Sequence, residues 1–210
     1  FQETSHDLWD YDISSPPIIY DLNIGNKIYE TVIVVTKTGN TLILDRNNGK
    51  PIYDIHYRRA PESKLSGEYT SKFQIDLKVP EKFSKIEFSP DDLSNLSEKE
   101  KNDLSSVIDN SIYGWYEPPK FGKYTLLNGL HGGATWPGFS SNPNKNLVFI
   151  PVNTNPFKFK IEVPNKAPFT YTFVVPSFIK TTDTYVQSFK VVFGTTVKNG
   201  ICFEQLITTL

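Results

Sequence analysis

The chain has 210 residues, with 22 basic and 23 acidic side chains and a formal net charge of −1. The two signs of charge are interspersed, and the absence of a long basic stretch argues against nucleic acid as a partner. No apolar run reaches the ~18 residues that a membrane-spanning helix needs, and no signal peptide is visible. Aromatic residues make up 14% of the chain and there are 15 prolines, which favours short strands over a helical bundle.

The cysteine content and the start of the chain also limit the possibilities. Cys202 is the single cysteine, so an internal disulfide and a thiolate-type metal site are excluded. The chain begins with Phe1 and contains no Met. Because a motif rich in reactive side chains stands at its very start, we expect the sequence to be a fragment of a longer protein.

The first candidate site is the segment 6–12, which reads His-Asp-Leu-Trp-Asp-Tyr-Asp. It places three carboxylates, an imidazole and two aromatic rings within seven residues. Asp10 is the side chain that we select, because a carboxylate can take a proton or bind a metal ion. The alternative is an ordinary solvated turn, since Asp is common in turns.

A hairpin follows. The β-branched run 29–35 predicts a buried strand, the sequence Lys-Thr-Gly-Asn at 37–40 predicts a tight turn, and 41–44 predicts the return strand. A further turn at 45–51 and a short strand complete a meander like that of a propeller blade. Lys37 lies 37 − 10 = 27 residues after Asp10. This spacing corresponds to a strand, a loop and another strand, which can return the chain to the same end of a sheet. We therefore expect both side chains to face one pocket, although a lysine at a hairpin tip is the simpler alternative.

The middle of the chain is less regular. Residues 58–88 predict a long loop with short extended pieces, and a loop of this length is usually functional or covers a surface. Ser97 and Glu100 form a capping box, which predicts one structural helix over 98–109. Strands are predicted at 147–152 and around 158–163 and 170–175.

A glycine-rich segment at 130–138 reads Leu-His-Gly-Gly-Ala-Thr-Trp-Pro-Gly. Its paired glycines allow a close approach of the backbone, and Trp136 could form a flat wall for a planar ligand. A turn with Trp136 anchored in the core is the reading that the residues favour by themselves. The final segment, 184–210, alternates weakly and carries no turn signal of the earlier type, so we expect strands there that are poorly packed.

These motifs together resemble the quinoprotein dehydrogenases that use pyrroloquinoline quinone (PQQ), in particular the glucose, polyol and quinate dehydrogenases. The resemblance covers about residues 1–182. It rests on 1–12, 37–40, 44–49, 59–74 and the glycine-rich segment. It implies an all-β fold, a partial β-propeller that is a fragment of an eight-bladed quinoprotein propeller, with one short helix in an inserted loop. The implied organisation is an incomplete propeller segment over 1–183 and a divergent or poorly packed tail over 184–210.

The resemblance also implies roles. Asp10 matches the general base of the family, which is also a ligand of Ca²⁺ or Mg²⁺, and Lys37 matches the residue that contacts the quinone oxygens. Thr135 and Trp136 match a cofactor-binding pair, with Thr135 where the family often has Asn or Glu. The other metal ligands lie upstream in the family. His6 is then either a residue behind the site or a structural histidine, and Asp7 and Asp12 orient Trp9 and the turn.

The implied function is oxidation of a sugar, polyol or other alcohol by hydride transfer to PQQ, with electrons passed to a respiratory quinone or cytochrome. The implied location is the periplasm, with attachment to the inner membrane through a segment outside this chain. The chain as given is expected to be inactive, because metal ligands and blades are missing. The alternative is a non-catalytic propeller that serves as a scaffold or binding module.

Overall fold

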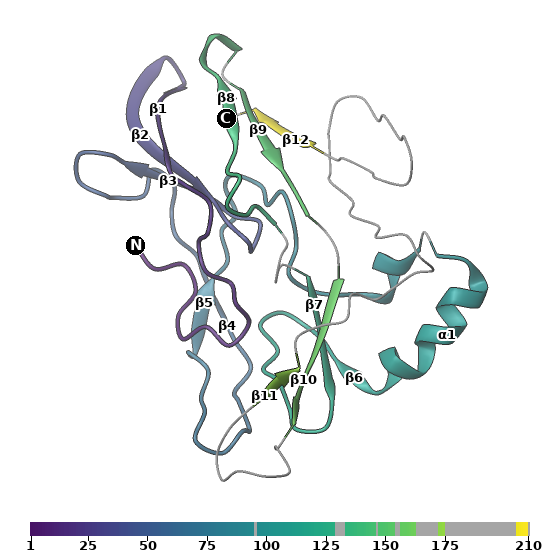
Figure 1. Cartoon of the computed structure of the whole chain (residues 1–210). Coiled ribbons are helices and arrows are strands. Elements are labelled where there is room, and N and C mark those ends of the chain that lie inside the picture. The colour runs from purple at the N-terminus through teal and green to yellow at the C-terminus, as the bar shows by residue number, and fades with distance from the viewer. Residues whose placement is uncertain are drawn as a thin grey trace.

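The computed structural model describes residues 1–94, 96–128, 133–145, 147–153 and 156–161, and the backbone alone of Glu162, 172–174 and 205–209. Short strands dominate this part of the chain, and α1 (Glu98–Asp109) is its one α-helix (Figure 1). Two short 3-10 helices lie at Pro90–Leu93 and Pro143–Lys145.

The first sheet is the predicted meander. It consists of β1 (Ile18–Ile24), β2 (Lys27–Val35) and β3 (Thr41–Asp45), which pair antiparallel in that order. Gly25 and Asn26 join β1 to β2 with positive φ angles of 56° and 67°, as a two-residue hairpin turn requires. The β-branched run predicts β2 correctly, because alternate residues of β2 are buried from Thr31 onwards.

The other strands that the structure describes form three further sheets. In one, β4 (Tyr57–Arg59) pairs with β5 (Phe73–Ile75). In another the order is β11 (Thr172–Val174), β10 (Pro156–Glu162), β7 (Tyr124–Asn128) and β6 (Ser111–Ile112). The last has the order β12 (Gln205–Thr209), β9 (Leu147–Pro151) and β8 (Ser140–Asn142). The strands predicted in the second half of the chain correspond to β9, β10 and β11.

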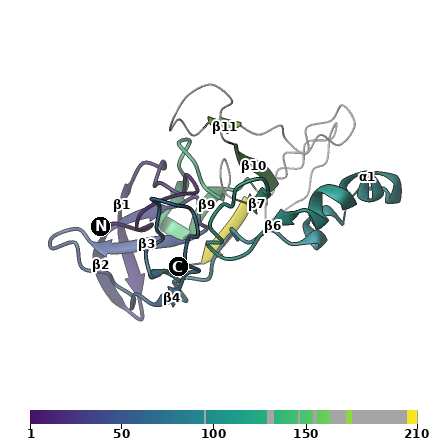
Figure 2. The same cartoon turned by 90° about the horizontal axis from the view of Figure 1, so that it is seen from below.

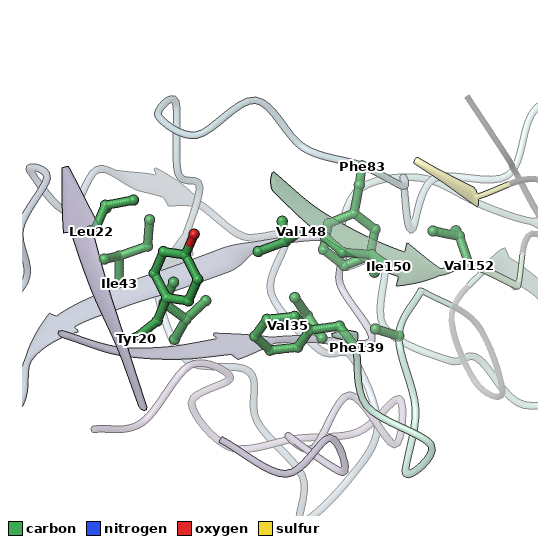
Figure 3. Packing of buried hydrophobic residues seen from close by; sticks show 11 residues of the cluster. Tyr20, Leu22, Val35, Ile43, Phe83, Phe139, Val148, Ile150 and Val152 are labelled. Atoms are coloured by element: carbon green, nitrogen blue, oxygen red, sulfur yellow. The ribbon is translucent and has the colours of Figure 1, made fainter. Parts of the chain in front are cut away.

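The main core lies between the first sheet and β9. Figure 3 shows Val35 of β2 and Val148 and Ile150 of β9 facing the rings of Phe83 and Phe139. Each of these side chains is buried. Burying a large aliphatic or aromatic side chain stabilises a fold by about 1.5–3 kcal/mol, so this cluster holds segments together that are far apart in the sequence.

Helix α1 has the predicted bounds and the predicted capping box, with Ser97 as its N-cap. It projects at one end of the molecule (Figure 2) and has no fully buried residue. Leu104 and Ile108 pack against a small cluster that includes Phe88 and Leu126. These contacts agree with the structural role that the sequence indicates.

The C-terminal segment 184–210 is described only at β12, whose backbone pairs antiparallel with β9. The rest of that segment, including Val191, Val192 and Phe193, lies outside the described residues. The boundary expected after residue 183 and the poor packing expected of the tail therefore stay predictions.

Candidate functional site

Asp10 and Lys37 meet directly. The Nζ atom of Lys37 lies 3.1 Å from Oδ2 of Asp10 and 3.0 Å from the Asp10 carbonyl oxygen, and donates to both. It also donates to Oδ1 of Asp12, at 2.5 Å. Lys37 is only 7% exposed, whereas the side chain of Asp10 is 58% exposed. The arrangement is a buried cation presented beneath two carboxylates that solvent can reach.

The two carboxylates keep Lys37 charged. Burial acts to lower the pKa of Lys37, but the hydrogen bonds and charges of Asp12 and Asp10 outweigh it and raise that pKa above its ordinary value. A lysine that stays protonated is a fixed positive charge. This site therefore offers electrostatic stabilisation of an anion rather than an amine nucleophile.

The loop that carries Asp10 is held by the aromatic core. The backbone N–H of Trp9 donates to Oδ1 of Asp7 at 2.9 Å, and the Trp9 indole donates to the carbonyl of Glu117 at 2.8 Å. The rings of Trp9 and Tyr11 both pack edge-on against Tyr116. With both neighbours of Asp10 buried, its own side chain is left at the surface.

Asp10 also has a positive φ of 63°. Asp tolerates this left-handed conformation better than most residues, and such conformations cluster at functional sites. Nearby, burial raises the pKa of Asp7 despite the hydrogen bonds from the backbone of the loop. The hydrogen bond from the Trp9 backbone to Asp7 agrees with the orienting role that the resemblance implies for Asp7. The carboxylate of Asp12 pairs with Lys37, a contact that the sequence did not indicate, and its role in orienting the turn stays a prediction.

The turn that carries Lys37 is fastened by a buried carboxylate, Glu3. Oε1 of Glu3 accepts hydrogen bonds from Oγ1 of Thr36 at 2.9 Å, from Nδ2 of Asn40 at 2.8 Å and from Oγ1 of Thr38. All four side chains are buried. Burying such groups without partners would be costly, so this network strongly favours one conformation of the turn.

Two further segments cross the backbone of the same turn. Phe83 N–H donates to the carbonyl of Gly39 at 3.1 Å, and Ala134 N–H donates to the carbonyl of Thr36 at 3.0 Å. A Cβ added at Gly133 would lie 2.2 Å from the carbonyl oxygen of Lys37. The irregular region 58–88 thus does more than connect strands, because its end packs directly on the Lys37 turn.

The other predicted cofactor residues lie just beyond this contact. Thr135 and Trp136 directly follow Ala134 in the chain, and the backbone of Ala134 is hydrogen-bonded to the Lys37 turn. Trp136 is 79% exposed, so the reading that anchors it in the core is wrong. A flat indole face is open to solvent, and contact of either side chain with a ligand stays a prediction. His131 and Gly132 of the same motif lie outside the described residues.

Gln74 and Glu68 join the long loop to the first segment. Gln74 is buried and clamps the backbone of Ser5, accepting from its N–H at 2.9 Å and donating to its carbonyl at 2.7 Å. Glu68 binds Nε2 of His6 at 2.6 Å, and this hydrogen bond lowers the pKa of Glu68. The His6 ring also stacks on Tyr69 at 3.7 Å. These partners give His6 a role in holding the loop.

Sequence reasoning missed Glu3 altogether and did not find the contact between Asp12 and Lys37. A lone Glu near the start of a chain carries no periodic or motif signal, so its partners across the fold could not be found from the sequence. In the described part of the chain, no group of three or more His, Cys, Asp or Glu side chains is placed to hold a metal ion. No helix among those residues is long and apolar enough to span a membrane.

The chain is similar to known proteins. Residues 1–191 match the family model of the PQQ glucose/ethanol/alcohol dehydrogenase β-propeller domain. The chain is 30% identical over 185 residues to quinoprotein glucose dehydrogenase A of Acinetobacter calcoaceticus, covering 80% of this chain and 22% of that protein. It is 25% identical over 168 residues to quinoprotein glucose dehydrogenase of Escherichia coli (strain K12), covering 77% of this chain and 20% of that protein.

Among solved structures, quinohemoprotein alcohol dehydrogenase from Comamonas testosteroni has 23% sequence identity and a TM-score of 0.42, covering 77% of this chain and 18% of that one. The chain spans about a fifth of the length of the curated relatives given above. The family match and the observed strands confirm the predicted fold class, which is all-β and part of a propeller.

Proposed function

Since this chain belongs to the family of PQQ-dependent dehydrogenase β-propellers, we propose that it forms part of the active site of an enzyme that oxidises a sugar, a polyol or another alcohol. The single observation that carries this proposal is the contact between Asp10 and Lys37, 3.1 Å apart. A non-catalytic propeller scaffold has no need of a buried lysine held beneath an exposed carboxylate, so the contact favours the enzyme.

Asp10 is the proposed general base. Its carboxylate is more than half exposed and its backbone is fixed by buried neighbours on both sides, so a substrate hydroxyl can approach it. In the proposed reaction Asp10 takes the proton of that hydroxyl, while the carbon that bears the hydroxyl loses a hydride. A positioned base contributes typically about 10²–10⁴-fold to a rate.

Lys37 is the proposed electrostatic partner. When bound, PQQ supplies an electrophilic quinone that accepts the hydride. The positive charge of Lys37 would stabilise negative charge on a quinone oxygen, and the raised pKa of Lys37 keeps that charge in place at neutral pH. Asp12 also accepts a hydrogen bond from the ammonium group. Thr135 and the exposed ring of Trp136 are proposed to contact the cofactor.

A Ca²⁺ or Mg²⁺ ion is part of the same proposal. Both ions take oxygen ligands, and the accessible carboxylate of Asp10 is a suitable donor. Because the described residues contain no group of three or more His, Cys, Asp or Glu side chains placed for a metal, Asp10 would supply one ligand and other residues must complete the set. The donor chemistry fits, but the described residues do not form a whole metal site.

The remaining assignments follow from the family. We propose the periplasm as the location, a respiratory quinone or a cytochrome as the electron acceptor, and attachment to the inner membrane through sequence outside this chain. Residues 1–183 are proposed to be the propeller segment, with 184–210 as a divergent tail.

The function can be tested on the enzyme expressed with the coding sequence that flanks this chain in its gene. The enzyme is loaded with PQQ and Ca²⁺ or Mg²⁺, and dye reduction is followed with glucose, polyols and simple alcohols. We expect turnover with at least one of these classes and its loss in Lys37→Gln. Lys50→Gln, a matched change at an exposed turn, should leave turnover intact. An intact rate in Lys37→Gln would contradict the proposal.

A further inference from the structure

Glu3 is a buried acidic residue, only 2% exposed, and the proposed chemistry assigns it no part. Its Oε1 atom accepts all three of the hydrogen bonds from Thr36, Thr38 and Asn40. These donors come from both sides of Lys37, at positions −1, +1 and +3 relative to it. One oxygen atom therefore closes the turn around the lysine.

Glu3 belongs to the segment that leads into the Asp10 loop. Two more contacts tie this segment in place: Oγ1 of Thr4 donates to the carbonyl of Tyr11 at 3.2 Å, and Gln74 clamps both backbone groups of Ser5. Tyr11 is the residue between Asp10 and Asp12. The segment 3–5 is thus hydrogen-bonded to the Asp10 loop through Thr4 and to the Lys37 turn through Glu3.

Burying a carboxylate costs desolvation free energy that burying an apolar side chain does not. Burial raises the pKa of Glu3 even though three side chains donate to it, and Lys82 is the charged group whose field opposes that rise. Lys82 itself is paired with Asp76 at 2.7 Å. An apolar side chain of similar size would avoid the desolvation cost, so the hydrogen bonds to the turn are what this residue specifically provides.

We propose that Glu3 is a positioning residue, which holds the Lys37 turn so that the ammonium group stays within hydrogen-bonding distance of Asp10 and Asp12. Its importance for catalysis rests on the proposed function, but its effect on Lys37 does not. Without the carboxylate, the three donors lose their shared acceptor, the turn relaxes, and Lys37 moves away from the carboxylates that protect it.

The test is the reactivity of the Lys37 amine in the full 210-residue chain, without cofactor or substrate. Wild type, Glu3→Ala and Glu3→Gln are treated with acetic anhydride at fixed pH, and the acetylation rate of each lysine is measured by mass spectrometry. The exposed Lys50 is the internal reference. Lys37 is 7% exposed and its ammonium group is hydrogen-bonded to Asp10 and Asp12 in the wild type, so a turn that relaxes exposes the amine to the reagent and raises its rate.

We expect the Lys37 rate to rise severalfold in Glu3→Ala and to stay near that of the wild type in Glu3→Gln, which keeps an acceptor oxygen. Leu126→Ala, a change to a buried side chain in another cluster, controls for general loss of stability and should leave Lys37 protected. Should Glu3→Ala fail to fold, Thr38→Val removes one of the three donors and should give a smaller rise.

Unchanged Lys37 reactivity in folded Glu3→Ala, or in Thr38→Val where Glu3→Ala does not fold, would overturn the proposal. Equal reactivity in Glu3→Ala and Glu3→Gln, or in Glu3→Ala and Leu126→Ala, would do the same. Since no turnover is measured, this result is independent of the catalytic assay. A catalytically silent enzyme with a Glu3-dependent Lys37 would refute the proposed function and leave the positioning role intact.

Discussion

Replacing Gly133 by Ala tests whether the glycine-rich segment is packed on the Lys37 turn. Gly133 has a φ of 57°, and an added Cβ would lie 2.2 Å from the carbonyl oxygen and 2.5 Å from the carbonyl carbon of Lys37. The left-handed conformation costs Ala roughly 1–2 kcal/mol. Forcing the two backbones apart costs roughly 1–3 kcal/mol more, a large share of the ~5–15 kcal/mol by which domains are stable.

Gly25→Ala is a matched control, because Gly25 has nearly the same φ, 56°, and an added Cβ there meets nothing within 4 Å. Both variants restrict the unfolded chain equally, so their difference isolates the clash. Urea unfolding of the 210-residue chain should show Gly133→Ala to be less stable than Gly25→Ala by about 1–3 kcal/mol. Equal stability of the two variants would refute the packing described for Gly133 and Lys37.

Three further predictions follow from the site. Asp12→Asn removes a charge that raises the pKa of Lys37, so the amine should be acetylated faster than in wild type, and an unchanged rate would show that Asp12 does not hold it. The raised pKa of Glu3 means that the folded state keeps the Glu3 proton to higher pH than the unfolded chain does. The stability contributed by that proton is fully present below about pH 4.5, the ordinary pKa of Glu, and is lost as the pH rises through the pKa of Glu3 in the folded state. Urea unfolding should therefore show Glu3→Gln gaining stability relative to wild type as the pH rises from about 4 to 7, and a constant difference would argue against a raised pKa. The 210-residue chain mixed with PQQ and Ca²⁺ should reduce no dye with glucose or polyols, because it spans only about a fifth of the length of its dehydrogenase relatives, and robust turnover would contradict that account.

Local patterns predicted the local structure well. The β-branched run over 29–35 and the Thr-Gly-Asn turn predicted the hairpin of β2 and β3, and the capping box at Ser97 predicted the bounds of α1. In these segments the residues that decide the structure are neighbours in the sequence. Within 58–88 the sequence predicted short extended pieces but not the pairing of β4 with β5, because these strands are three residues long and every residue of β4 is exposed, which leaves no alternating pattern.

The site was only partly predictable. The spacing of two motifs placed Asp10 and Lys37 together, and the structure confirms their contact. The other residues that hold Lys37 or its turn, Asp12 and Glu3, could not be found this way. Glu3 is 34 residues away from Lys37 in the chain, and Asp12 looks like any other acid of an Asp-rich turn. Such roles depend on tertiary packing, and a single sequence carries no signal for them.

The most direct test of the central claim is the turnover of Asp10→Asn in the enzyme expressed with its flanking coding sequence. Asn keeps the size of the side chain and can still accept from Lys37, but it cannot take a proton from an alcohol. We predict that turnover falls by about 10²–10⁴-fold, while Asp109→Asn, at the end of α1, retains full activity. Turnover of Asp10→Asn equal to that of the wild type would contradict the assignment of this site.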